Sequence, residues 1–163
     1  MHTMRKILIA LLACVSCSQA DTSDEAEARV RRLYEAHRPW DGVEIDFHAS
    51  NALSPYFDAS LTQLLLDDHA CELRVGEICN LDFDPVLAAQ DYDDAGLREL
   101  RLERQAGPGG IVVSVTFQNL DQTQHIAYDV VCPPAGCRIT DVRYDTGPSL
   151  RTLLSTPVEA TSR

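Results

Sequence analysis

The stretch that decides the fold is Ile111-Val112-Val113-Ser114-Val115-Thr116-Phe117, in which an apolar residue recurs at every second position. Residues 126–130 repeat this alternation, and a polar turn at 119–122 separates the two stretches. Side chains of a strand point alternately to its two faces, so each stretch would bury one face. The pattern predicts two antiparallel strands joined by a short turn.

Two further strands flank this pair. Apolar and charged residues alternate at 100–103, before the glycine-rich turn 107–110, and a last strand, 138–144, follows a proline-rich turn. In the last strand Ile139 and Val142 are three positions apart, so both face the core only if the strand contains a bulge. Four strands in a row with short turns predict an antiparallel meander.

The first half of the chain has helical patterns. Residues 24–37 carry apolar side chains at helical spacing, and a second helical region begins near Ala52. Asp58 or Ser60 is expected to cap the helix that follows, which we expect to run through His69.

Two short helical segments complete the expected elements. Asp84 followed by Pro85 is typical of an N-cap with a proline in the first turn, and predicts a helix at 86–90. Residues 149–154 form a final helical turn. Helices first and a curved four-stranded antiparallel meander second predict an α+β fold, with the N-terminal helices packed on one face of the sheet.

Residues 1–20 resemble an export signal. A basic start precedes a short apolar run, and the small residues Ser18 and Ala20 stand where signal peptidase cleaves. The alternative is a lipoprotein signal, residues 1–13, because the tetrapeptide that ends at Cys14 resembles a lipobox and would make Cys14 the lipidated N-terminus. With either signal the rest of the chain is expected to form one α+β domain, which is 21–163 if cleavage follows Ala20. That domain would lie in the periplasm or, as a lipoprotein, on the outer membrane.

The four cysteines beyond residue 20 predict two local disulfides. Cys132 and Cys137 flank a turn between two strands, where facing residues lie at the Cα separation that a disulfide requires. Cys71 and Cys79 would close a second short loop. Neither spacing is the C-x2-C knuckle of zinc sites, so we predict no metal and no cofactor.

The chain is strongly acidic. Its formal net charge is −11 over 163 residues, and residues 21–163 hold 12 arginines and 25 acids, which makes −13. Nucleic acids and anionic membranes attract basic surfaces, so the charge argues against both as partners.

Several short motifs resemble one bacterial family. Leu81-Asp82-Phe83-Asp84-Pro85, followed by Ala89-Gln90-Asp91, is similar to the signature of the domain of unknown function numbered 3828. Residues 56–57 and 61–66 upstream, and 140–144 and 149–151 downstream, resemble its flanking blocks, so the resemblance covers roughly residues 26–155. It implies an exported protein, often a lipoprotein, with the cone-shaped fold of nuclear transport factor 2-like and cystatin-like proteins. It implies no activity, since that fold hosts enzymes, binding modules and scaffolds.

The family motif also contains the densest polar cluster. Paired carboxylates such as Asp82 and Asp84 can share a proton or hold calcium. Counted from Asp82, however, the sixth position is Leu87 rather than the glycine that an EF-hand loop needs. We therefore expect Asp84 to cap a helix and Gln90 and Asp91 to hold loop backbone.

Asp46, His48 and Tyr128 are candidate pocket residues. Asp46 and His48 occupy alternate positions and so would point together, and Tyr128 lies on the predicted third strand. No motif accompanies them, and satisfied or exposed side chains are the expected outcome. His69 lies late in a helix, where an imidazolium suits the helix dipole.

Catalytic motifs are missing from the sequence, which has no G-x-S-x-G, H-E-x-x-H, P-loop or G-x-G-x-x-G. We therefore expect a non-catalytic envelope protein, not an enzyme, that binds a protein or cell-wall partner. One alternative is a periplasmic immunity protein or inhibitor, whose acidity would speed its encounter with a basic toxin or hydrolase. The other is a carrier or enzyme that holds a small apolar molecule in the cone pocket.

Overall fold

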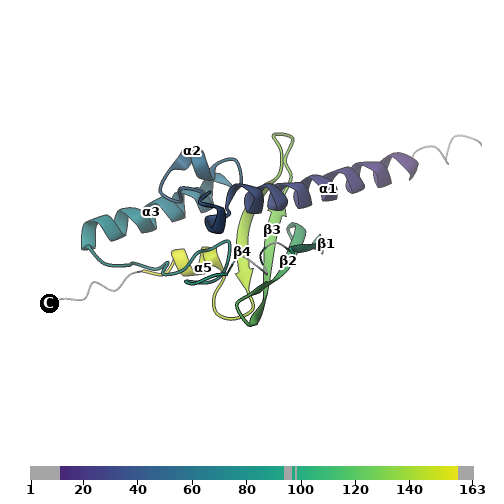
Figure 1. The fold of residues 1–163 in the computed structure, drawn as a ribbon. Coiled ribbons are helices and arrows are strands. Elements are labelled where there is room, and N and C mark those ends of the chain that lie inside the picture. Colours follow the sequence, from purple (N-terminus) through teal and green to yellow (C-terminus); the bar gives the residue numbers. More distant parts are fainter. Residues whose placement is uncertain (1–11, 94–96, 98, 158–163) are drawn as a thin grey trace, which may run out of the picture.

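The computed structural model describes residues 12–93, 97 and 99–157, and for residues 12–21 it describes only the helical backbone. The described residues form an α+β fold in which helices precede a four-stranded antiparallel sheet (Figure 1). The elements in chain order are α1 (Leu12–Ala36), η1 (Pro39–Asp41), α2 (Ser50–Leu53), α3 (Ala59–Val75), β1 (Arg101–Gly107), β2 (Gly110–Asn119), β3 (Gln122–Val131), β4 (Arg138–Tyr144) and α5 (Leu150–Leu154).

The sheet is the predicted meander, with strand order β1-β2-β3-β4 and every neighbouring pair antiparallel. The expected bulge is present between β3 and β4. Asp129 pairs with Asp141 while Val130 pairs with Ile139, which leaves one extra residue on β4. Because of this extra residue, Ile139 and Val142 are both fully buried although they are three positions apart.

Helix α1 crosses one face of the sheet, and the space between them is filled by side chains (Figure 1). Tyr34 of α1 packs edge-on against Phe117 and Tyr128, with ring centroids 6.1 Å away in each case. The Tyr128 hydroxyl donates to the Tyr34 hydroxyl at 2.9 Å, and Tyr34 donates to the carbonyl of Val86 at 3.0 Å. Burial raises the pKa of both tyrosines well above the ordinary value, so they stay neutral in the folded protein.

The start of α3 is attached to the edge of the sheet. The carboxylate of Asp58 accepts from the backbone N–H of Leu61 at 2.7 Å, which makes Asp58, one of the two expected caps, the N-cap. The residues just before the cap pair with β4, where Phe57 forms a parallel bridge with Ile139. Arg151 of α5 donates to Asp58 and to the carbonyl of Thr140, so one guanidinium joins α3, β4 and α5.

Both expected disulfides are present. Cys71–Cys79 links the last turn of α3 to the loop that follows, and Cys132–Cys137 closes the turn between β3 and β4. Disulfides persist in oxidising compartments, so the two bonds suggest a location outside the cytoplasm.

Two expected boundaries and one expected helix need correction. The first helix begins at Leu12 rather than near residue 24, and α3 continues past His69 to Val75. The expected helix at 86–90 is instead a turn, because Ala88 has a left-handed backbone (φ 53°) and Asp84 bridges directly to Ala89. Asp84 therefore has no helix to cap, and its carboxylate instead holds the turn by accepting from the backbone N–H groups of Val86 and Leu87.

The predicted leader, 1–20, lies largely outside the described residues. Residues 1–11 are not described, and nothing is described of the Cys14 side chain, so the two alternative signals stay predictions. Among the helices of the described chain, none has both the length and the apolar character that a bilayer span requires.

Candidate functional site

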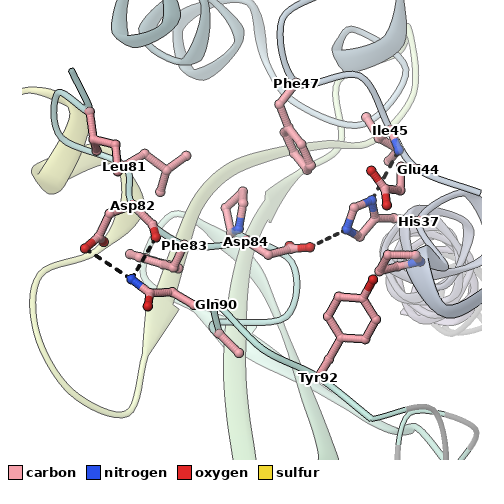
Figure 2. A pocket seen from close by; sticks show the side chains of 14 residues that line it. His37, Glu44, Ile45, Phe47, Leu81, Asp82, Phe83, Asp84, Gln90 and Tyr92 are labelled. Carbon is pink, nitrogen blue, oxygen red and sulfur yellow. Dashed lines mark hydrogen bonds and ion pairs between the residues drawn. The ribbon is translucent and has the colours of Figure 1, made fainter. Parts of the chain in front are cut away.

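An open groove of about 690 Å³ lies between two loop segments, 37–47 after α1 and 78–92 after α3 (Figure 2). These loops are packed together at the end of α1, so residues far apart in the sequence face one another. The lining residues are His37, Pro39, Glu44, Ile45, Phe47, Ile78, Leu81, Asp82, Phe83, Asp84, Pro85, Ala89, Gln90 and Tyr92.

At the centre of the groove His37 contacts Asp84 (Figure 2). The Nε2 atom of His37 lies 2.5 Å from Oδ2 of Asp84, while Nδ1 accepts from the backbone N–H of Ile45 at 3.2 Å. Since Nδ1 accepts, the proton of a neutral imidazole is on Nε2, which donates to the carboxylate. Both ring nitrogens are therefore occupied, and the imidazole, only 3% exposed, has no free lone pair for a substrate.

The floor of the groove is apolar and aromatic. Phe47 packs edge-on against the imidazole of His37, with centroids 5.4 Å apart, and Phe83 packs edge-on against Tyr144 at 5.2 Å. Leu81 also lines the groove and packs against the core. These contacts fix the rings in place, so the floor is a preformed apolar surface rather than a set of mobile side chains.

The rim of the groove is acidic. Glu44 and Asp82 are both exposed and stand on opposite loops (Figure 2). Gln90 holds the Asp82 segment by donating from Nε2 to its carbonyl at 3.0 Å. None of the described lining residues is Arg or Lys, and the one imidazole, that of His37, is bonded to the carboxylate of Asp84. The groove therefore has a negative potential.

Comparisons with protein-family models, curated proteins and solved structures gave no match. The function must therefore be inferred from the geometry of the chain itself.

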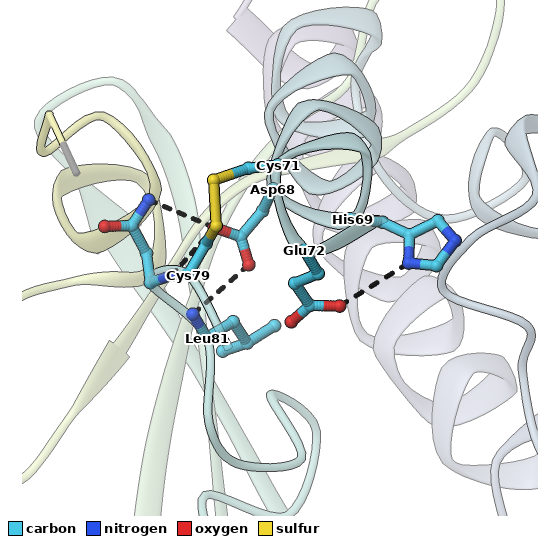
Figure 3. The surroundings of a disulfide bond; sticks show 7 residues. Asp68, His69, Cys71, Glu72, Cys79 and Leu81 are labelled. Carbon is cyan, nitrogen blue, oxygen red and sulfur yellow. Dashed lines mark hydrogen bonds and ion pairs between the residues drawn. A yellow bond between two sulfur atoms is a disulfide. The ribbon is translucent and has the colours of Figure 1, made fainter. Parts of the chain in front are cut away.

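One wall of the groove is attached to α3 by two kinds of bond (Figure 3). Besides the disulfide, the buried carboxylate of Asp68 accepts from the backbone N–H of Asn80, from the Asn80 side-chain amide and from the backbone N–H of Leu81, at 2.9–3.2 Å. Three donors satisfy this carboxylate, as burial of a charge requires. The segment that carries Leu81 and Asp82 is thus fixed before any partner arrives.

Exposed apolar side chains lie at the mouth of the groove and beyond it. Ile78 is 64% exposed and Tyr92 is 39% exposed, and both line the groove. Leu73 and Val75, 74% and 50% exposed, lie at the end of α3 on the same disulfide-closed segment as Ile78. Exposed apolar groups that adjoin a preformed groove are characteristic of interaction sites.

The predicted pocket residues do not share a cavity. Tyr128 is fully buried in the core, whereas the side chains of Asp46 and His48 are about 60% exposed. The motif residues do come together, since Asp82, Asp84, Pro85 and Gln90 all line the groove. Asp91 lies next to it, and its carbonyl accepts from the side-chain amide of Asn119 at 2.9 Å.

Sequence reasoning missed two residues of the groove region and one contact outside it. His37 falls at the end of the expected helical stretch 24–37 and was given no role there, and Asp68 and the contact between His48 and His69 were not anticipated. One signal in the sequence could have identified Asp68. It lies on the buried side of the amphipathic helix α3, and a carboxylate that is buried there needs hydrogen-bond donors. Among the described residues, one group of histidine and acidic side chains could hold a metal ion, and it lies outside the groove, at His48, His69 and Glu72.

Proposed function

We propose that this chain is a non-catalytic protein of the bacterial envelope that binds a segment of another protein in the groove. The observation that carries the proposal is the composition of the groove, in which an apolar floor lies beneath two exposed carboxylates and no Arg or Lys is among the described lining residues. The complementary ligand has apolar side chains for the floor and Lys or Arg side chains for Glu44 and Asp82. Such a pattern is that of a basic, apolar protein segment.

The state of His37 supports binding rather than catalysis. A general base needs a free lone pair within reach of the substrate, and the geometry assigns both nitrogens of His37 to groups of the protein itself. Both carboxylate oxygens of Asp84 also have partners within the protein. One accepts from His37 and the other from the backbone of the following turn. The pair is therefore better suited to hold the groove in shape than to transfer a proton.

The location in the envelope is part of the proposal. The two disulfides support an oxidising compartment. Cleavage of the leader after Ala20 would release the protein into the periplasm, whereas lipidation of Cys14 would attach it to the membrane. A net charge of −13 over residues 21–163 would favour encounter with a basic partner in either position.

We further propose that the chain belongs with the domain of unknown function numbered 3828 and has the cone-like fold of nuclear transport factor 2-like proteins. The motif residues support this proposal by their position, because four of them line the groove and Asp84 bonds to His37, the residue that follows α1. The space between α1 and the sheet is occupied by core side chains in the described residues. This packing favours a ligand on the outer groove over a small molecule inside the cone.

Photo-crosslinking from the groove tests the proposal. A photoreactive amino acid replaces Ile78 or Tyr92 in the groove, or Gln105, an exposed residue of the edge strand β1, as the control. Cells are irradiated, and the products are purified and analysed by mass spectrometry. We expect one and the same protein to crosslink from both groove positions and not from Gln105, through a peptide that contains Lys or Arg beside apolar residues. Products that carry only cell-wall glycan, or equal products from all three positions, would contradict the proposal.

A further inference from the structure

Two histidines from separate segments meet on the outer side of α3, away from the disulfide. His48 lies in the loop before α2, and His69 lies on α3. Their rings stack with centroids 3.6 Å apart and planes inclined by 19°. No buried contact requires this arrangement, since the side chain of His48 is 57% exposed.

Glu72 completes a group of three possible metal ligands. It follows His69 by three positions, so both side chains project from the same face of α3, and its Oε2 lies 3.5 Å from Nδ1 of His69 (Figure 3). One ligand atom from each of His48, His69 and Glu72 can be chosen so that all of them lie within 4.8 Å of one another.

A fourth residue orients His48. Asp46 accepts from the backbone N–H of His48 at 2.9 Å, and the same oxygen lies 3.6 Å from Nδ1 of the ring. A carboxylate beside one nitrogen of an imidazole favours the proton on that nitrogen and leaves the other nitrogen free to bind a metal. In His48 the free nitrogen is then Nε2.

We propose that His48, His69 and Glu72 form a binding site for a divalent transition-metal ion, with Zn²⁺ as the best-fitting ion. Two imidazole nitrogens and one carboxylate oxygen are a donor set typical of zinc, whereas calcium and magnesium take oxygen ligands almost exclusively. Three protein ligands leave a fourth position of the tetrahedron for water or for a group of a partner.

Binding requires a small closure of the site. Zinc–nitrogen distances of about 2.0–2.1 Å require ligand atoms that point at one centre, so the two stacked rings must turn until their lone pairs converge. His48 can make this movement because it is exposed and lies on a loop, while His69 and Glu72 are fixed relative to each other by the helix.

The site would link the groove to α3 on a second side. Residues Glu44, Ile45 and Phe47, which line the groove, precede His48 directly in the chain. The opposite wall is already attached to α3 through Cys71–Cys79 and Asp68. A metal ion between His48 and α3 would therefore fix the remaining groove wall, in the way that the disulfide fixes the first.

Calorimetric titration with ZnCl₂ tests the site. The full chain is used with its disulfides intact and without chelators, after alkylation of any accessible thiol so that no thiol competes for zinc. Matched variants are His48→Gln, His69→Gln and Glu72→Gln, and the control is His125→Gln, an exposed histidine on β3. Circular dichroism of each variant checks that the fold is unchanged.

The expected result is saturable binding of one Zn²⁺ per chain. Each histidine variant should weaken the affinity at least tenfold, Glu72→Gln should weaken it less, and His125→Gln should leave it within twofold. The midpoint of thermal unfolding should rise with zinc in the original chain and not in His48→Gln, whose exposed side chain contributes little to the core. Absence of saturable binding, or an affinity that none of the three variants changes, would overturn the proposal.

Discussion

His37 and Asp84 are 47 residues apart in the chain, and the Nε2 atom of the first lies 2.5 Å from Oδ2 of the second. This bond connects the residue that follows α1 to the turn that forms the groove. The other nitrogen of His37 accepts from Ile45, so a single imidazole contacts both loops of the groove. The shape of the candidate site therefore depends on one buried hydrogen-bonded pair.

Loss of this pair should destabilise the whole fold. We expect His37→Ala or Asp84→Ala to lower the free energy of unfolding by about 2–4 kcal/mol. The first leaves the backbone N–H of Ile45 without its acceptor, and the second leaves the imidazole N–H and the backbone N–H groups of Val86 and Leu87 without theirs. Equilibrium urea unfolding with the disulfides intact measures the effect. The exposed His125→Ala should change it by less than about 0.5 kcal/mol. A His37→Ala variant as stable as the His125→Ala control would show that the bond between His37 and Asp84 does not stabilise the fold.

High pH should destabilise the protein through its buried tyrosines. Burial raises the pKa of Tyr34, Tyr128 and Tyr144 above the ordinary value of 10.0. In the unfolded chain these groups ionise near pH 10, and in the folded chain they stay protonated. The folded state therefore binds more protons, and the stability that it gains below pH 10 is lost as the pH rises further.

Absorbance at 295 nm and circular dichroism, recorded together above pH 9, check this dependence. Three of the five tyrosines should ionise only as the secondary structure disappears. Tyr128→Phe should reduce that number to two. Complete ionisation of all five tyrosines while the circular dichroism stays unchanged would contradict the burial of the Tyr34, Tyr128 and Tyr144 hydroxyls.

The two disulfides should contribute comparable amounts of stability. Both close short loops, with sequence separations of 8 and 5 residues. In the loop-entropy model each such bond is worth about 2–3 kcal/mol, the longer loop slightly more. The double variants Cys71→Ser/Cys79→Ser and Cys132→Ser/Cys137→Ser, compared by urea unfolding, measure the two contributions. An unchanged free energy of unfolding in either double variant would mean that the bond does not constrain the chain.

Asp68 should matter far more than its neighbour Asp67. The Asp68 carboxylate is buried and accepts three hydrogen bonds from Asn80 and Leu81, whereas Asp67 is exposed. Asp68→Asn replaces one acceptor oxygen by a donor, and we expect it to cost about 1–3 kcal/mol. Asp67→Asn is the matched control, with an expected effect below about 0.5 kcal/mol. Equal unfolding free energies for the two variants would refute the assigned role of Asp68.

Much of the sheet could be predicted from local pattern. Strands β2 and β3 bury one face, so the period of two is visible in the sequence, and the bulge in β4 follows from the spacing of Ile139 and Val142. The caps at Asp58 and Ser149 are also local, since each accepts from a backbone N–H three residues on.

The groove could not be predicted in the same way, because its contacts are long-range. Residues after Asp84 have helical character, yet they form a turn that returns to Ala89 and is bonded to His37. The choice between helix and turn is thus made by tertiary contacts, which override local propensity. The stacking of His48 on His69 likewise depends on how a loop packs against α3, and no local spacing reports it.

The central claim is that the groove binds a basic segment of a partner protein. Reversing the charge of the groove rim tests this claim most directly. The double variant Glu44→Arg/Asp82→Arg changes the rim, and Asp67→Arg/Glu103→Arg makes the same change in net charge at exposed residues outside the groove lining. The quantity measured is the yield of the partner that crosslinks, in intact cells, to a photoreactive amino acid in place of Tyr92. Loss of at least nine-tenths of the product in the groove variant, with the control variant close to the original chain, is the predicted result. An equal yield in both variants would contradict the account, because recognition would then not depend on the groove.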